Sequence, residues 1–143
     1  FYYCNCKTLN LIPSCLAATA ADRAGCQEAI FHRGDLVTEC AHSNVSIFKD
    51  GKVITHQLDD KVLPGTARIR LLAFAKKLGF GVEERDYTLD ELMNADEIIV
   101  HSTGSFCIPV KTVDGKPVGG KAPEMLKTIQ DALVKDFEEQ CKA

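Results

Sequence analysis

The stretch LVTECAHSNVSIFKDGKVIT, residues 36–55, decides the fold that this sequence predicts. It holds β-rich runs that meet at a polar corner, and the second run turns back on itself through Asp50-Gly51. Asp-Gly between apolar runs is a strong hairpin signal, because both residues tolerate a positive φ angle. Residues 36–55 therefore predict strands joined by a corner and a tight antiparallel turn.

Glu39 is the acid of this stretch, in a strand that otherwise has the pattern of a half-buried one. A lone buried carboxylate is costly, so a buried acid needs a partner. Two interpretations stay open at this point: a strand-end glutamate that faces solvent, and a functional acid. Motifs elsewhere in the chain decide between them.

The composition indicates one globular domain over residues 1–143. The chain is 45% hydrophobic and 26% charged, and this length suits a single core. The net charge of −3 argues against nucleic acid or an anionic membrane as the main partner. No run of 18 apolar residues occurs, so we expect no span of a bilayer and no membrane partner.

The seven cysteines are odd in number, irregularly spaced and without a Cys-x-x-Cys pair. We expect reduced thiols and a cytoplasmic location. A zinc site built on Cys4, Cys6 and a histidine is a weaker alternative, since paired-ligand spacing is missing. The start of the chain, Phe1-Tyr2-Tyr3-Cys4, has the character of the middle of a strand, so we expect a fragment.

Further elements follow from periodicity, capping signals and glycine stops. We expect strands over 1–6, 26–31, 82–85 and 97–101, helices over 13–24, 67–78 and 88–94, a second Asp-Gly hairpin over 107–118, and a last helix from Pro123. Helices and strands do not alternate strictly, and both hairpins require antiparallel pairs. The predicted fold class is mixed α/β (α+β), with a largely antiparallel sheet curled into a partial barrel and helices packed outside.

Three features point to one kind of ligand. Gly65-Thr66 stands at the mouth of a helix, where free amides and the helix dipole favour a phosphate, although Thr66 also suits a plain cap. Residues 102–105, Ser-Thr-Gly-Ser, follow a buried strand and offer hydroxyls and amides to an anion, or form a polar turn. Lys7 ends the first predicted strand; most lysines are solvated surface charges, whereas a partly buried one has a lowered pKa and becomes a nucleophilic amine.

A lysine amine, an acid and a phosphate cradle are the groups that a protein supplies to pyridoxal 5′-phosphate. The lysine forms a Schiff base with the aldehyde, and an acid opposite the pyridine nitrogen keeps that nitrogen protonated. Glu39 would be this acid. Each part is common by itself, so the residues alone make this a hypothesis.

The sequence resembles the C-terminal domain of the D-amino-acid aminotransferases, which are members of the fold type IV enzymes that use pyridoxal phosphate. The matching words occur in the family's order over nearly the whole chain: CNCKTLNL (4–11), GCQEAI (25–30), VTE (37–39), SNV (43–45), KDG (49–51), LPG (63–65), ST (102–103) and IPV (108–110).

The resemblance implies a role for each matching residue. Lys7 corresponds to the lysine that forms the Schiff base and moves the substrate proton, and Glu39 to the glutamate at the pyridine nitrogen. Leu63 corresponds to the aliphatic residue against the ring, and Ser43 lies in a loop near the cofactor. The phosphate would be bound by Gly65, Thr66, Ala67, Ser102 and Thr103.

The sequence departs from the family's pattern in several places. The family's turn has an apolar residue and then threonine, whereas Thr66 here precedes Ala67, so the hydroxyl is displaced by one position. Cys40 and His42 replace small residues, and Phe106 and Cys107 stand where relatives often carry an acid and an apolar residue.

The family's N-terminal domain, which supplies an arginine for the phosphate, the substrate-carboxylate pocket and half of the dimer contacts, is expected to be absent from these residues. The resemblance implies transamination between a D-amino acid and a 2-oxo acid in a homodimer. The alternatives are a sibling enzyme, such as a branched-chain aminotransferase or aminodeoxychorismate lyase, and a non-catalytic binding domain.

Overall fold

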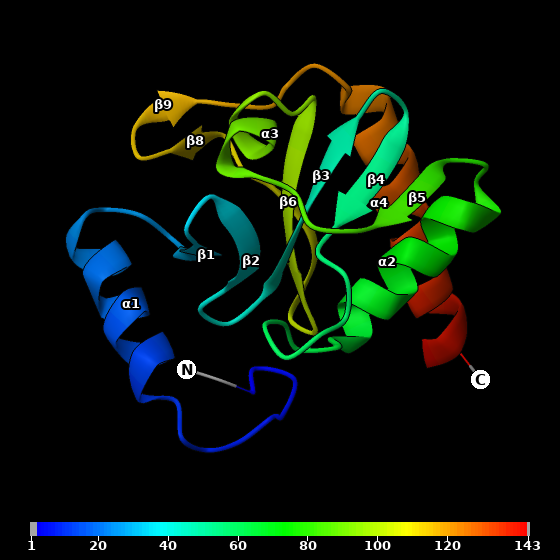
Figure 1. The fold of residues 1–143 in the computed structure, drawn as a ribbon. Coiled ribbons are helices and arrows are strands. Elements are labelled where there is room, and N and C mark those ends of the chain that lie inside the picture. Colours follow the sequence, from blue (N-terminus) through cyan, green and yellow to red (C-terminus); the bar gives the residue numbers. More distant parts are fainter. Residues whose placement is uncertain (1–2, 143) are drawn as a thin grey trace.

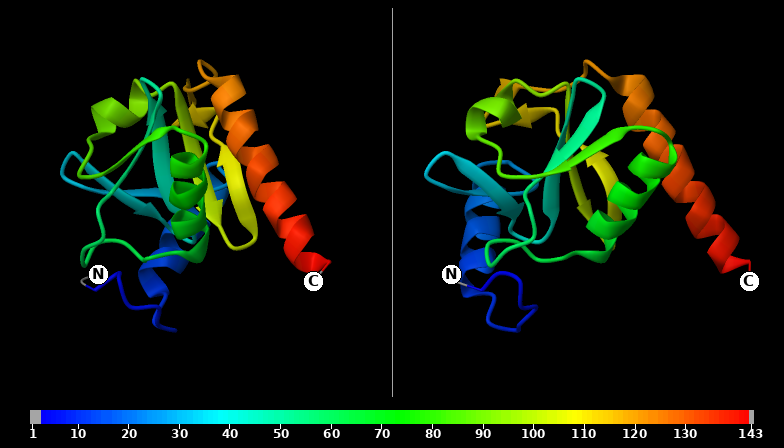
Figure 2. Two further views of the ribbon diagram at one scale, coloured as in Figure 1. Left: turned by 90° about the vertical axis from the view of Figure 1, so that its right-hand side faces the viewer. Right: turned by 45° about the vertical axis from the view of Figure 1, so that its right-hand side comes forward.

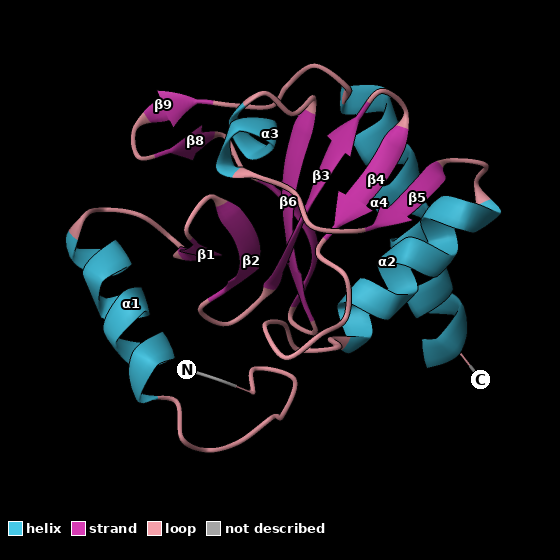
Figure 3. Ribbon diagram, in the orientation of Figure 1, coloured by secondary structure: helices cyan, strands magenta, loops and turns pink. Residues whose placement is uncertain are grey.

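The computed structural model describes residues 3–142, and it contains a mixed sheet with helices on its faces (Figures 1 and 3). In chain order, the elements of the described residues are α1 (Ile12–Arg23), β1 (Ile30–Arg33), β2 (Leu36–Cys40), β3 (Asn44–Lys49), β4 (Lys52–Thr55), α2 (Thr66–Lys77), β5 (Gly81–Glu84), α3 (Leu89–Met93), β6 (Glu97–Ser102), β7 (Ser105–Pro109), β8 (Thr112–Val113), β9 (Lys116–Pro117) and α4 (Pro123–Cys141).

The main sheet has the strand order β5-β4-β3-β6-β7. Its β4–β5 pair is parallel, and the other three pairs are antiparallel. Strands β1 and β2 form a separate antiparallel ladder, as do β8 and β9. This largely antiparallel sheet with packed helices confirms the predicted fold class, and the described strands do not close into a barrel.

Both predicted Asp-Gly hairpins are confirmed. Asp50 and Gly51 have φ angles of 49° and 75°, and Asp114 and Gly115 have φ angles of 48° and 74°. Two positive φ angles in succession match the right-handed twist of the flanking strands. The first turn sets the register of β3 against β4, with Lys49 opposite Lys52.

The sheet separates two apolar cores. Helices α2 and α4 cover one face, as Figure 2 shows in green and orange-red, and the core between these helices and the sheet includes Phe48, Leu71 and Ile129. The other face packs against β2 and the α3 region through residues such as Val37 and Leu92. Strand β6 serves both cores, since Ile98 belongs to the second and Ile99 to the first. This confirms the predicted burial of β6 on both faces.

The start of the chain differs from the prediction. Phe1 and Tyr2, the first residues of the expected strand, lie outside the described residues, and residues 4–6 form a turn. A strand needs a neighbour with which to exchange hydrogen bonds, and the Cys4 amide instead donates one bond to the Asp60 carbonyl, at 2.7 Å. The expected strand over 1–6 is therefore wrong for residues 4–6.

Two other boundaries shift. The strand expected over 26–31 occupies Ile30–Arg33, and the one expected over 107–113 is divided into β7 and β8. Helix α1 forms where predicted and ends before Gly25, whose φ angle is 73°. It contributes no buried residue, and Figure 1 shows it beside the body of the molecule in blue. We call residues 3–23 the N-terminal arm.

No helix among the described residues has the length and apolar character that crossing a membrane requires.

Candidate cofactor site

Glu39 lies near the end of β2 and is partly buried. Its carboxylate oxygen Oε2 accepts a hydrogen bond from the backbone N–H of Leu63, at 2.8 Å. Burial raises the pKa of Glu39 to about 7, while the Leu63 amide and the Cys4 thiol act in the opposite direction. A partly buried carboxyl group that has a pKa near 7 and accepts a bond from a turn is not the solvent-facing glutamate of the first interpretation.

Residues 63–65 form a compact turn ahead of α2. The Gly65 amide donates to the Leu63 carbonyl at 2.8 Å, and the Asn44 side chain donates to the same carbonyl at 2.9 Å. Asn44 is buried, and its Nδ2 also lies 3.5 Å from Glu39 Oε2. Sequence reasoning gave Asn44 no role, although its place just after the acid and before an apolar run was a signal.

The N-terminus of α2 is open to an anion. Gly65 caps the helix without a side chain, and the first turn carries no acidic residue. The unpaired amides and the positive end of the dipole are the groups that bind phosphate at helix starts. Ala67 is buried in this turn, so the backbone there approaches the sheet closely.

Two residues that are predicted to bind phosphate meet at this helix start. The Thr66 and Thr103 hydroxyl oxygens lie 3.2 Å apart, although 37 residues separate them in the chain. Both side chains are exposed. The displaced threonine of the turn thus presents its hydroxyl beside Thr103. Thr103 itself stands in the turn between β6 and β7.

A polar layer is buried beneath the first turn of α2. Arg68 is 2% exposed and donates to the His56 carbonyl and to Glu84, both at 2.9 Å. His101 is fully buried, its Nε2 lies 2.9 Å from Ser46 Oγ, and burial, aided by the Arg68 charge, lowers its pKa to about 3. His101 is therefore neutral at physiological pH, and Arg68 carries the buried positive charge behind the helix start.

The loop over residues 56–62, which leads to the 63–65 turn, is held by buried His56. Its Nε2 lies 3.2 Å from Asp59 and its Nδ1 lies 3.5 Å from Asp86, on opposite sides of the ring. Within the described part of the chain, His56, Asp59 and Asp86 form the cluster whose ligand atoms lie close enough to hold a metal ion. Neither Cys4 nor Cys6 belongs to this cluster. The Lys61 ammonium pairs with Asp59, so one of the two carboxylates of this cluster is already engaged by a cation.

Three residues that are predicted to belong to the site do not contact Glu39 or the start of α2 through any bond described above. Lys7 is exposed within the N-terminal arm, and the described residues before it form a turn in place of the expected strand. Ser43 donates to Glu28, at 2.9 Å, and so turns away from the Glu39–Leu63 contact. Ser102 ends β6 and pairs with Ser105 across the turn.

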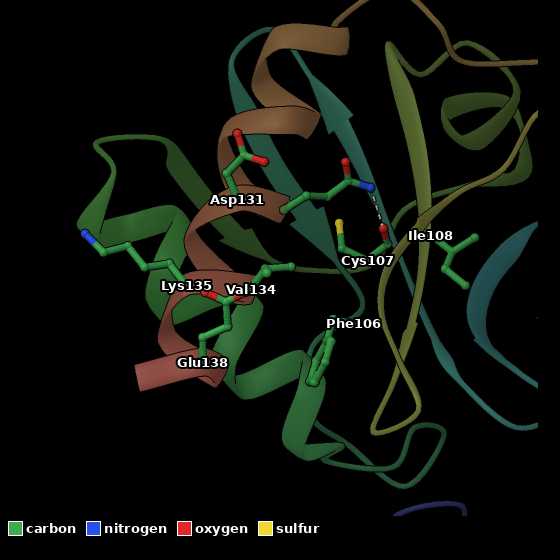
Figure 4. A pocket seen from close by; sticks show the side chains of 8 residues that line it. Phe106, Cys107, Ile108, Asp131, Val134, Lys135 and Glu138 are labelled. Carbon is green, nitrogen blue, oxygen red and sulfur yellow. Dashed lines mark hydrogen bonds between the residues drawn. The ribbon is translucent and has the colours of Figure 1, made fainter. Parts of the chain in front are cut away.

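The cleft that Figure 4 shows belongs to another part of the molecule. It has a volume of about 550 Å³ and lies between β7 and α4, where Gln130 donates to the Cys107 carbonyl at 2.8 Å. Phe106 packs on Phe137 with ring centroids 5.4 Å apart, and Cys107 is buried. These two departures from the family's pattern therefore face α4.

The residues that converge are Glu39, Asn44, Leu63, Gly65, Thr66 and Thr103, and we call this group the cradle. It offers an acid at one end and a helix start with paired hydroxyls at the other. A family model, that of class IV amino-transferases, matches residues 1–113. The chain belongs to this family.

Two curated relatives are D-alanine aminotransferases. The D-alanine aminotransferase of Listeria monocytogenes serotype 4b (strain F2365) is 40% identical over 139 residues, which are 96% of this chain and 48% of that protein. The D-alanine aminotransferase of Staphylococcus aureus (strain COL) is 38% identical over 136 residues, which are 94% and 48%. The chain thus spans about half the length of the curated relatives it matches.

Solved structures share the fold. The branched-chain amino acid aminotransferase from Escherichia coli superposes with a TM-score of 0.82 at 33% identity, over 87% of this chain and 43% of that one. A fold IV transaminase from Curtobacterium pusillum gives a TM-score of 0.83 at 26% identity, over 95% and 46%. The architecture is therefore that of half a fold type IV aminotransferase.

Proposed function

We propose that this chain is the cofactor-binding part of a pyridoxal-phosphate-dependent aminotransferase that exchanges the amino group between a D-amino acid and a 2-oxo acid. The observation that carries the proposal is the cradle. At one end of the short segment 63–66 the Leu63 amide bonds to the Glu39 carboxyl group, and at the other end the Thr66 hydroxyl meets that of Thr103. This arrangement suits a planar ring with a basic nitrogen on one side and a phosphate on the other.

The donor groups fit the cofactor. Gly65 caps the helix start without a side chain, and the phosphate would lie against the amides of Thr66 and Ala67 and the hydroxyls of Thr66 and Thr103. Leu63 is half-buried and offers an aliphatic surface to the ring. When bound, the cofactor supplies an aldehyde that condenses with amines and a ring that accepts electron pairs.

Each residue of the chain has a defined task. Glu39, ionised, would pair with a protonated pyridine nitrogen, and that cation would lower the pKa that burial now raises. The Lys7 amine would hold the cofactor covalently and then carry a proton to and from the substrate α-carbon. Because Lys7 is exposed on the N-terminal arm, its placement over the cradle depends on contacts beyond those of the described residues.

We also propose that the complete protein is a homodimer. The N-terminal arm supports this, because Leu9 is 98% exposed and Ile12 and Leu16 are each about two-thirds exposed. Apolar side chains gathered on one segment are typical of a surface that another chain or domain covers. A reducing, cytoplasmic setting is proposed as well, since Cys40 and Cys107 are buried as free thiols.

Covalent labelling tests the function. The full-length gene product is incubated with pyridoxal phosphate, reduced with borohydride and digested, and mass spectrometry locates the label. We expect one pyridoxyl group on Lys7, none in Lys7→Ala, and an unchanged pattern in the control Lys111→Ala, which alters another exposed lysine. Label spread over many lysines and unaltered in Lys7→Ala would refute the assignment.

Substrate assays then separate the branches of the family. We expect amino transfer from D-alanine and slower transfer from L-leucine or L-valine. The reverse preference would favour a branched-chain enzyme. Label on Lys7 without transfer from any amino acid would favour a binding domain that has kept the scaffold.

A further inference from the structure

Asn44 is a buried polar residue whose bonds run to the cradle. It is 7% exposed and begins β3, where its Cα pairs with that of His101 in β6. A buried amide must satisfy its donors and acceptors within the protein. Its donor group turns toward the Glu39 carboxylate and the 63–65 turn, which belong to two separate segments of the chain.

These bonds close a small ring. Asn44 Nδ2 donates to the Leu63 carbonyl at 2.9 Å, and the Leu63 amide donates to Glu39 Oε2 at 2.8 Å. The same Nδ2 stands 3.5 Å from Glu39 Oε2. Both peptide groups of Leu63 are thus held, one by the acid and one by the amide, and Asn44 lies beside both.

Asn44 also explains the glycine of the turn. Gly65 has φ −64° and ψ 141°, angles that any L-residue adopts, so its backbone conformation does not require glycine. A Cβ atom on Gly65 would lie 2.3 Å from Asn44 Oδ1. The requirement for glycine is therefore the close approach of this side chain, which packs against the capping residue of α2.

We propose that Asn44 is a positioning residue that fixes the Glu39 carboxylate relative to the phosphate-binding turn. The inference rests on the proposed function, and it deepens it. A ligand with a basic ring nitrogen and a phosphate must contact the Glu39 carboxylate and the phosphate-binding turn at the same time. If the carboxylate moves relative to the turn, the ligand loses one of these contacts. Asn44 itself donates to the Leu63 carbonyl and packs against Gly65. It couples the carboxylate and the turn through Leu63 and Gly65.

The test uses the full-length gene product with pyridoxal phosphate. We compare Asn44→Ala and Asn44→Ser with Asn94→Ala, a control that removes an asparagine bonded to Asp90 at the end of α3. The Asn44 variants should raise the cofactor Kd about tenfold or more, since the bond to the Leu63 carbonyl and the fixed position of Glu39 relative to the turn are both lost. They should also shift the pH midpoint of the bound cofactor's absorption band by about half a unit or more, because Glu39 loses a neighbouring donor.

A second measurement is independent of the cofactor. Gly65→Ala should lower the thermal midpoint by several degrees through its clash with Asn44, and Asn44→Ala introduced with it should restore part of that loss. Such a recovery requires direct contact between the two residues. Should Asn44→Ala fail to fold, Asn44→Ser provides the same measurements.

The outcomes are distinct. A wild-type protein that binds no cofactor overturns the proposed function. A wild type labelled on Lys7, with Asn44 variants that match it in Kd and in pH midpoint, overturns the role of Asn44 alone. Variants that bind more weakly with an unshifted midpoint, to the same extent as Asn94→Ala, also overturn it, because they indicate general loss of stability.

Discussion

The N-terminal arm and the cradle, which would supply different parts of the proposed cofactor site, are built differently. The cradle is held by the chain's own bonds: Glu39 to Leu63, Leu63 to Asn44, and Thr66 to Thr103. The arm carries Lys7 on an exposed loop and continues into α1, which buries no residue. Glu39 and the start of α2 are thus connected by bonds within residues 36–105, whereas Lys7 is exposed on the arm.

The largest effect is expected from Lys7. Lys7→Ala in the full-length gene product should lower kcat by about 10³-fold or more, because a covalent anchor and a proton carrier are lost together. The thermal midpoint of the cofactor-free protein should not change, since the side chain is exposed. Steady-state kinetics and thermal denaturation check both parts. A similar activity in Lys7→Ala would place the chemistry on another residue.

Matched leucine truncations test the contrast in packing. In the isolated chain, Leu71→Ala should lower the free energy of unfolding by about 2–5 kcal/mol, because Leu71 is fully buried on the inner face of α2. Leu16→Ala should change it by about 0.5 kcal/mol or less, because Leu16 is 66% exposed. Urea denaturation measures both.

The same Leu16→Ala change sharpens the comparison when it is made in the full-length gene product. If the arm is covered there, the substitution should cost more than in the isolated chain. An equal and negligible cost in both would indicate that α1 stays solvent-exposed, and would count against the proposed dimer contact.

The pH dependence of stability tests the burial of Glu39. Its folded pKa lies near 7 and its usual value is 4.5, so the folded state binds the proton more tightly. The stabilisation of the folded state by the protonated Glu39 is fully present below pH 4.5 and is lost as the pH rises to about 7. The cofactor-free chain should therefore lose up to about 3 kcal/mol across that window, and less where solvent screens the carboxylate.

Glu39→Gln serves as the control for this titration, because its side chain carries no proton in that window. The difference between wild type and Glu39→Gln in denaturation at several pH values isolates the effect from other groups. A constant difference from pH 4.5 to 7 would mean that Glu39 is solvated. Saturating pyridoxal phosphate should flatten the slope, since a protonated ring nitrogen would keep the carboxylate ionised.

The smallest effect is expected at the hydroxyl pair. Thr66→Val and Thr103→Val should each raise the cofactor Kd about threefold to tenfold, the worth of one hydrogen bond. The double variant should lose less than the product of the two, because the hydroxyls contact each other. Thr112→Val, on exposed β8, is the control. Strict multiplication of the single effects would show that the two threonines act separately.

Local features were predictable because they depend on near neighbours in the chain. The Asp50-Gly51 and Asp114-Gly115 hairpins follow from residues that accept positive φ, and the Thr88–Glu91 capping box is present with both of its hydrogen bonds. The unbroken apolar run in β6 indicated burial on both faces. Where the prediction failed, at residues 4–6, the local β character lacked a strand with which to pair.

The sequence by itself determined the hairpins, the helix limits, the fold class and the identity of most residues in the cradle, because these depend on short-range geometry and on short sequence motifs. The tertiary structure alone decided how these residues meet. It brought Thr66 to Thr103 across 37 positions, directed Ser43 to Glu28, and set Asn44 against Gly65. Such contacts arise from the packing of α2 and β3 against β6, and no local propensity encodes the distance between segments that only the folded core brings together.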